Sequence, residues 1–166
     1  MMKMSEQTTI EYYKDALNNY TMEQLRYKSV EDVWSVGQMY DHLIAVALEY
    51  IAHIETCAAS SEEQMSGRTE AGEELFQLGG FPPIKIKLPP EYIPRNPESK
   101  EEIIAGLDDV QEKLGKWADK VDYINPRCRC NHNGFGWLNA REWYDLVDMH
   151  FRHHLRQKAE LDQKLV

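Results

Sequence analysis

The sequence has no long apolar run and no apolar leader segment. Its longest purely apolar stretch, Leu43 to Leu48, ends at Glu49, far short of the roughly 20 residues that a membrane-spanning helix needs. The first residues also lack an apolar segment between a basic start and a cleavage site of small residues, which argues against secretion. We therefore expect a cytoplasmic protein with no membrane partner.

Cysteines are too few for a disulfide framework. Cys57, Cys128 and Cys130 are odd in number, and the C-x-C pair would close a loop too small to be useful. Together with His132, this pair offers soft metal ligands at alternate positions. Structural zinc sites use wider pairs, however, and no second pair completes four ligands. The sequence therefore predicts reduced thiols in an ordinary loop.

Basic residues are also scarce relative to acidic ones. The chain has 28 acidic and 19 basic side chains and a formal net charge of −9, so its surface repels phosphate backbones and nucleic acid is not an expected partner. Apolar residues nevertheless make up 42% of the chain, too many for a disordered acidic segment. With 166 residues, we expect a single domain that spans residues 1–166.

Four segments have the periodicity of amphipathic helices, with apolar residues three and four positions apart. Three of them begin at box-like caps, where Ser35, Ser99 or Asn139 precedes Gln or Glu by three positions. A similar box at Thr21 starts a short turn. The predicted helices span residues 6–20, 35–56, 99–121 and 139–161.

A long connection, residues 61–97, separates the second and third predicted helices. Its first half is acidic, and six of the seven prolines lie between Pro82 and Pro97, a density that excludes a helix there. The alternation from Ile84 to Leu88 fits either a short edge strand or a segment that wraps over the end of a bundle. Residues 127–136, rich in Asn, Gly and Cys, are predicted to form an irregular loop.

These elements predict an all-α protein, a four-helix bundle with a long proline-rich crossover between helices two and three. The crossover follows because a long connection lets two consecutive helices lie parallel. Aromatic residues near helices three and four are expected to lie mostly in the core, although some could form a dimer face: Trp117, Tyr123, Trp137, Trp143 and Tyr144.

Two histidines stand on the apolar stripe of the last predicted helix. His150 and His154 are four residues apart, about 6 Å of helical rise, so both imidazoles can address one ion. A core histidine is more often simply satisfied by hydrogen bonds, but two on one stripe would each need a partner in an apolar region. The third ligand should come from helix two, where His42 lies in the well-capped first half.

Other side chains compete with these three or support them. His53 lies about 16 Å further along the helix axis than the first candidate on helix two, so one ion cannot reach both. His53 or His153 remains an alternative to one of the predicted ligands. Gln157 is expected to orient a ligand or a bound water molecule. No carboxylate stands out as a general base, and Glu49 is the nearest candidate.

Two motifs carry a family resemblance. The stretch W-S-V-G-Q-M-Y-D-H-L at residues 34–43, and the closing segments at 132–143 and 150–157, are similar to those of DinB-like proteins. That superfamily includes the YfiT-like metal-dependent hydrolases. The resemblance extends over nearly the whole chain, in the order of the helices and the placement of both motifs. The connection at residues 61–97 carries nothing over.

The resemblance implies a divalent metal ion bound by His42, His150 and His154, and a homodimer. Three neutral imidazoles leave open positions that suit the activation of water or a thiol, and they accept zinc, nickel or iron. Some relatives transfer low-molecular-weight thiols such as bacillithiol. The expected function is therefore a metal-dependent hydrolase or thiol S-transferase that acts on a small-molecule substrate. The alternative is a non-catalytic helical bundle that binds a metal ion or a ligand.

Overall fold

The computed structural model describes residues 8–82 and 91–165. It is mostly helical with one small antiparallel sheet, which confirms the prediction of a mainly helical protein. Within the described ranges, no helix has both the length and the apolar character needed to cross a bilayer. The elements are α1 (Thr9–Ala16), η2 (Leu17–Asn19), α2 (Met22–Arg26), α3 (Val36–Ala59), α4 (Glu70–Leu78), α5 (Lys100–Ala118), η3 (Val121–Tyr123), β1 (Cys130–His132), β2 (Gly136–Leu138), α6 (Ala140–His153) and α7 (Leu155–Gln163).

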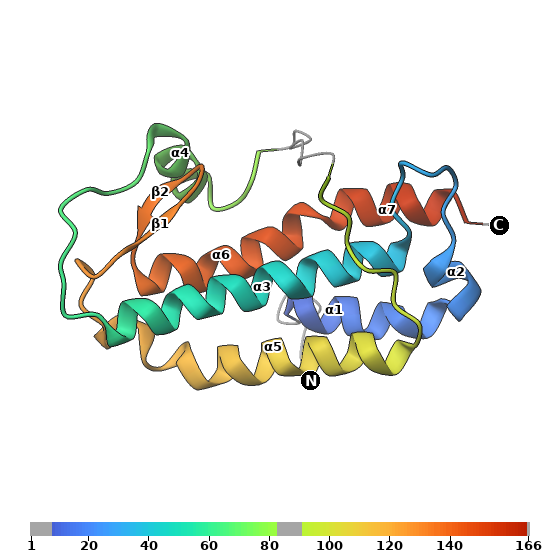
Figure 1. Cartoon of the computed structure of the whole chain (residues 1–166), viewed down its shortest axis with the longest axis horizontal. Helices are drawn as coiled ribbons and strands as arrows, with labels where there is room; N and C mark the ends of the chain where they lie inside the picture. Colours follow the sequence, from blue (N-terminus) through green and yellow to red (C-terminus); the bar gives the residue numbers. More distant parts are fainter. Residues whose placement is uncertain (1–7, 83–90, 166) are drawn as a thin grey trace.

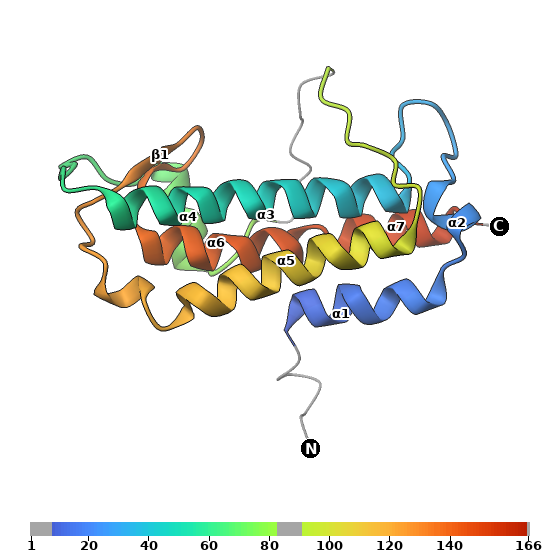
Figure 2. The same ribbon diagram turned by 60° about the horizontal axis from the view of Figure 1, so that its bottom comes forward.

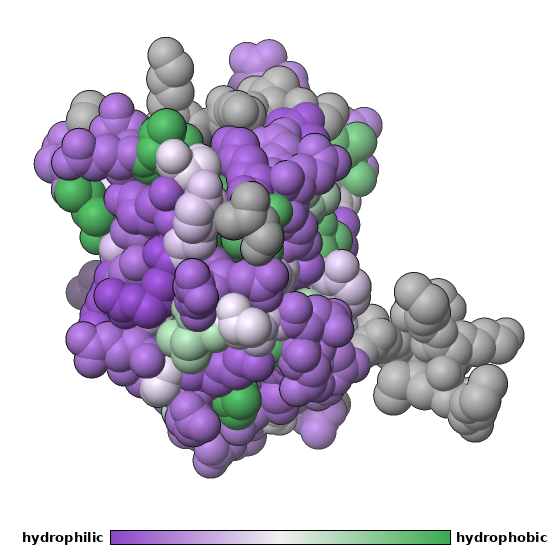
Figure 3. Space-filling model, turned by 90° about the vertical axis from the view of Figure 1, so that its right-hand side faces the viewer, coloured by the Kyte–Doolittle hydropathy of each residue, from purple (hydrophilic) through white to green (hydrophobic). Residues whose placement is uncertain are grey.

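The long helical segments lie side by side along the longest axis of the molecule (Figure 1, Figure 2). α3 packs against both α6 and α5, and α1 packs against α5 and α6. In both views α3 and α5 run in the same direction, whereas α6 runs opposite to α3. The end of the molecule that carries α2 and α7 is mostly hydrophilic on the outside (Figure 3), and the apolar side chains pack between the helices.

The start of α3 forms as its sequence predicts. The Ser35 hydroxyl accepts a hydrogen bond from the Gln38 amide (3.0 Å), and the Gln38 side-chain oxygen accepts one from the Ser35 amide (2.9 Å). The Gln38 side chain also donates to the Pro94 carbonyl (2.9 Å), which ties the cap to the end of the proline-rich segment. Reciprocal caps of the same kind start α2 at Thr21 and α6 at Asn139. His42 is thus held in a rigid helical turn.

The cap of α5 is only half of the predicted box. Ser99 accepts a hydrogen bond from the Glu102 amide, but the Glu102 carboxylate is bound by the Arg95 guanidinium instead of reaching back. Near the N-terminus, α1 begins after a Thr8 cap that was not predicted from the sequence. The Ile84 to Leu88 alternation lies outside the described residues.

The irregular loop predicted for residues 127–136 is wrong, because this region contains an antiparallel hairpin. Cys130 pairs with Leu138, and His132 pairs with Gly136. Gly136 has a φ of 88°, a conformation that other residues rarely adopt, and it also forms a bridge with Arg68. The hairpin therefore depends on a distant segment that the local sequence does not reveal.

The helix α4 was not predicted either. It lies in the acidic half of the connection, and the Thr69 hydroxyl caps it by accepting from the Gly72 amide (3.1 Å). Gly72 packs so closely against the hairpin that a Cβ there would lie 2.2 Å from the Phe135 carbonyl oxygen. A helix this short is marginal alone, so contact with the hairpin stabilises it.

The last predicted helix is interrupted at His154, the third of its histidines. α6 ends at His153 and α7 begins at Leu155, with His154 between them at φ −84° and ψ −2°. No proline or glycine occurs there. The interruption lies where this helical segment brings His150 and His154 to His42 of α3. Of the aromatic residues expected mostly in the core, Trp143 is 1% exposed but Tyr123 is 89% exposed.

Candidate metal centre

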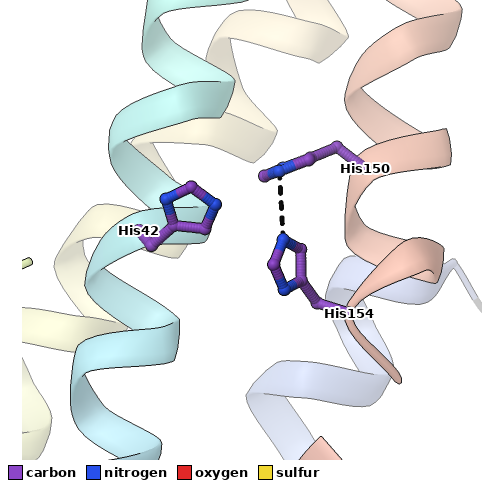
Figure 4. A group of neighbouring side chains, drawn as sticks. All are labelled: His42, His150 and His154. Carbon is purple, nitrogen blue, oxygen red and sulfur yellow. Dashed lines mark hydrogen bonds between the residues drawn. The ribbon is translucent and has the colours of Figure 1, made fainter. Parts of the chain in front are cut away.

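The structure brings together three of the histidines that the sequence singled out. His42 comes from α3, His150 from α6 and His154 from the α6–α7 junction, and their rings face one another (Figure 4). One nitrogen of each ring lies within 4.8 Å of the other two, and the Nε2 atoms of His150 and His154 are 3.1 Å apart. In the part of the chain that the structure describes, this is the one group of three residues arranged as potential metal ligands.

Hydrogen bonds orient two of these imidazoles. The Nδ1 atom of His154 lies 2.6 Å from the side-chain oxygen of Gln157, which can only accept, so Nδ1 carries the proton and Nε2 keeps a lone pair. The Nδ1 atom of His42 lies 2.8 Å from the Tyr92 hydroxyl. In each ring the outer nitrogen is occupied, which leaves Nε2 for the centre of the group. Metal-bound imidazoles in proteins typically have such outer partners.

His150 differs from the other two. It is buried, and its Nδ1 atom has no hydrogen-bond partner among the described residues, while its Nε2 atom faces His154. Two neutral imidazoles whose Nε2 atoms both keep lone pairs would repel at this distance unless a proton or a cation lay between them. The converging nitrogens can therefore share either a proton or a cation.

Burial keeps the three imidazoles uncharged. It lowers the pKa of His42 to about 3, and the proximity of His154 adds to this effect. Burial likewise lowers the pKa of His154 to about 4, against the opposing influence of the Gln157 hydrogen bond. The pKa of His150 falls well below its usual value for the same primary reason. Neutral nitrogens with free lone pairs are what a divalent ion requires.

Aromatic side chains surround the group. The ring centroids of Trp34 and His42 are 5.1 Å apart, and those of Tyr50 and His150 are 6.0 Å apart. Phe81 lies 5.9 Å from the His150 ring on another side. No carboxylate belongs to the group, and Glu49 is exposed on α3. The surroundings are thus mostly aromatic. Tyr92 and Gln157 are the hydrogen-bond partners of the rings, and the His153 ring lies with its centroid 5.0 Å from that of His154.

Tyr92 is a residue that the sequence did not single out. It begins a short segment, residues 92–97, that runs alongside the first two turns of α3. In this segment the Arg95 amide donates to Asp41 (2.9 Å), and Asn96 accepts from the Ser35 hydroxyl (2.7 Å). No local pattern could have identified Tyr92, because its contact with His42 depends on the path of a proline-rich segment through space.

The alternative ligands lie outside the group. His53 stacks on Trp143 with ring centroids 4.3 Å apart, further along α3. His153 adjoins the group, with its ring centroid 5.0 Å from that of His154 and 4.7 Å from that of Phe81, but it is not one of the three potential ligands. The Nδ1 atom of His132 accepts hydrogen bonds from two backbone amides, so the proton of the neutral ring lies on Nε2. The C-x-C-x-H sequence accordingly belongs to no group of ligands in the described part of the chain.

Comparison with known proteins supports the family that the motifs suggested. The search of curated proteins finds no match, and neither does the search of solved structures. A family model described as the DinB superfamily matches residues 7–157, which include all three histidines of the group and the caps of α3 and α6. The chain therefore belongs to the DinB superfamily.

Proposed function

We propose that the protein binds a divalent metal ion through the Nε2 atoms of His42, His150 and His154. The observation that carries the proposal is the convergence of three buried, uncharged imidazoles, two of them with their outer nitrogens already occupied. Zinc, nickel and iron all suit an imidazole donor set. The family match adds independent support.

We further propose that the bound ion serves a metal-dependent enzyme, either a hydrolase or a low-molecular-weight thiol S-transferase of the bacillithiol type. The ion would act as a Lewis acid that lowers the pKa of a water molecule or a thiol. The protein's own part is to orient the ligands through Tyr92 and Gln157 and to exclude bulk water with Trp34, Tyr50 and Phe81. A small-molecule substrate is the expected reactant.

One observation favours the alternative, a non-catalytic bundle that binds a metal ion or a ligand. The group contains no carboxylate, and Glu49, the candidate base, is exposed. In this reading the ion joins α3 to the α6–α7 junction. Chelation separates the two functions: loss of turnover in a protein that stays folded supports catalysis, whereas a large loss of thermal stability without any turnover supports a structural ion.

The test of metal binding is quantitative metal analysis of the full-length protein and of the His150→Ala variant. We expect about one zinc, nickel or iron ion per chain in the wild-type protein and none in the variant. His53→Ala is the matched control, because it removes a histidine that lies outside the group, and it should keep the metal. Undiminished stoichiometric metal in His150→Ala would overturn the proposed ligand set.

We also propose the remaining features that the sequence and the family suggest. These are a single domain of four bundled helices with a crossover between α3 and α5, a homodimer, and a cytoplasmic location. The parallel directions of α3 and α5 (Figure 1) support the crossover. The net charge of −9 supports the absence of a nucleic-acid partner.

A further inference from the structure

One cysteine of the C-x-C-x-H sequence contacts another thiol at the far end of α3. Cys130, on β1, has its sulfur 3.6 Å from the sulfur of Cys57, which lies near the end of α3 and 73 positions away in the chain. The hairpin orients this contact, since alternate residues of a strand face the same side. Cys130 and His132 of β1 accordingly contact one region, at Cys57 and Tyr50, and Cys128, which precedes the strand, contacts Ser60.

Among residues 8–82 and 91–165, no strong interaction holds either sulfur in place. The other contacts of Cys57 and Cys130 are weak ones with the carbonyl oxygens of Leu138 (3.8 Å) and His53 (3.7 Å). A disulfide bond is about 2.05 Å long, so the two sulfurs need to approach by about 1.5 Å. Closing that distance requires a rotation about χ1 or a small shift of the three-residue strand.

We propose that Cys57 and Cys130 form a thiol–disulfide exchange site that reacts with low-molecular-weight disulfides. The two thiols differ in access: Cys57 is 1% exposed, whereas Cys130 is partly exposed. Burial raises the pKa of the Cys57 thiol to about 12, and the neighbouring Cys130 contributes to this effect. Cys130 is therefore the thiol that meets the reagent, and Cys57 is the one that resolves the product.

The exchange proceeds in two balanced steps. The Cys130 thiolate attacks one sulfur of the reagent RSSR, which forms a mixed disulfide with Cys130 and releases RS⁻. Cys57 then loses its proton and attacks the Cys130 sulfur, which forms the Cys57–Cys130 bond and releases the second RS⁻. Both leaving thiolates take up protons, so two protein thiols are oxidised by two electrons while RSSR is reduced to two RSH. The second step is intramolecular and is favoured by the contact already present.

The bond would join α3 to the hairpin that leads directly into α6. It would close a loop of about 73 residues, a size for which cross-linking restricts the unfolded chain substantially. We therefore expect the oxidised protein to unfold at a temperature about 5–10 °C above that of the reduced protein. Dithiothreitol should reverse the shift.

The experiment incubates the full-length, metal-free protein with glutathione disulfide and then alkylates it with N-ethylmaleimide in denaturant. Intact mass should show the loss of two hydrogens and a single alkylated thiol, and peptide mapping should link Cys57 to Cys130. In Cys57→Ser the reaction should stop with one glutathione on Cys130. Cys128→Ser is the matched control, and it should form the same bond as the wild-type protein.

Three results would overturn the proposal. They are three alkylated thiols in the wild-type protein after treatment, a bond between Cys128 and Cys130, and a stable glutathione adduct on wild-type Cys130. The wild-type measurement stands even if a variant fails to fold. Because the protein is metal-free throughout, failure here leaves the proposed metal site untouched, and failure of metal binding leaves the thiol site untouched.

Discussion

We expect acid to lower the free energy of unfolding of the metal-free protein, and we expect His42 to account for part of this pH dependence. Burial lowers the pKa of this side chain to about 3, whereas histidine in an unfolded chain titrates at about 6.5. Between about pH 6.5 and pH 3 the unfolded chain binds a proton that the folded chain does not bind, so the free energy of unfolding falls as the pH falls. The slope is about 1.4 kcal/mol per pH unit, which amounts to about 2 kcal/mol between pH 7 and pH 5.

The assay is urea unfolding at pH 7, 6 and 5 in the presence of EDTA, followed by circular dichroism. Glutamine is polar and does not titrate, so His42→Gln should lose about 2 kcal/mol less than the wild-type protein over this range, whatever its absolute stability. His53→Gln is the control, because His53 lies on the same helix but outside the group. Equal pH dependence in the wild-type protein and His42→Gln would refute the burial of an uncharged imidazole at this position.

Two further predictions concern the contacts around the site and the hairpin. Tyr92→Phe should lower zinc affinity about 10- to 100-fold in competition with a chelating dye, because it removes the hydroxyl beside the α3 ligand. Tyr123→Phe, at an exposed position, should not change zinc affinity. Equal affinities in the two variants would exclude a role of the Tyr92 hydroxyl in metal binding. Gly72→Ala should lower the free energy of unfolding by about 1–3 kcal/mol in urea titrations, since its Cβ would overlap the Phe135 carbonyl. Gly115→Ala, with nothing within 4 Å of the new Cβ, should cost nothing, and a Gly72→Ala variant of the same stability would contradict the close contact.

Most helix starts could be predicted because caps and periodicity are local properties. Ser35 and Asn139 each satisfy amides three positions away, so their sequence neighbours suffice to identify them. The helix α4 and the hairpin could not be predicted in the same way. Each is short, and each is stabilised by the other through Gly72, Gly136 and Arg68, contacts that no local window contains.

For the candidate site, the spacing of His150 and His154 was enough to predict that they share one helical face, and the capped start of the second predicted helix indicated His42. That is possible because helical geometry converts positions into directions. The meeting of α3 with the α6–α7 junction at these residues, and the contact of Tyr92 with His42 from 50 positions away, result from the packing of the whole chain. The contact between Cys57 and Cys130, 73 positions apart, arises in the same way, because such contacts depend on how whole elements pack rather than on their periodicity.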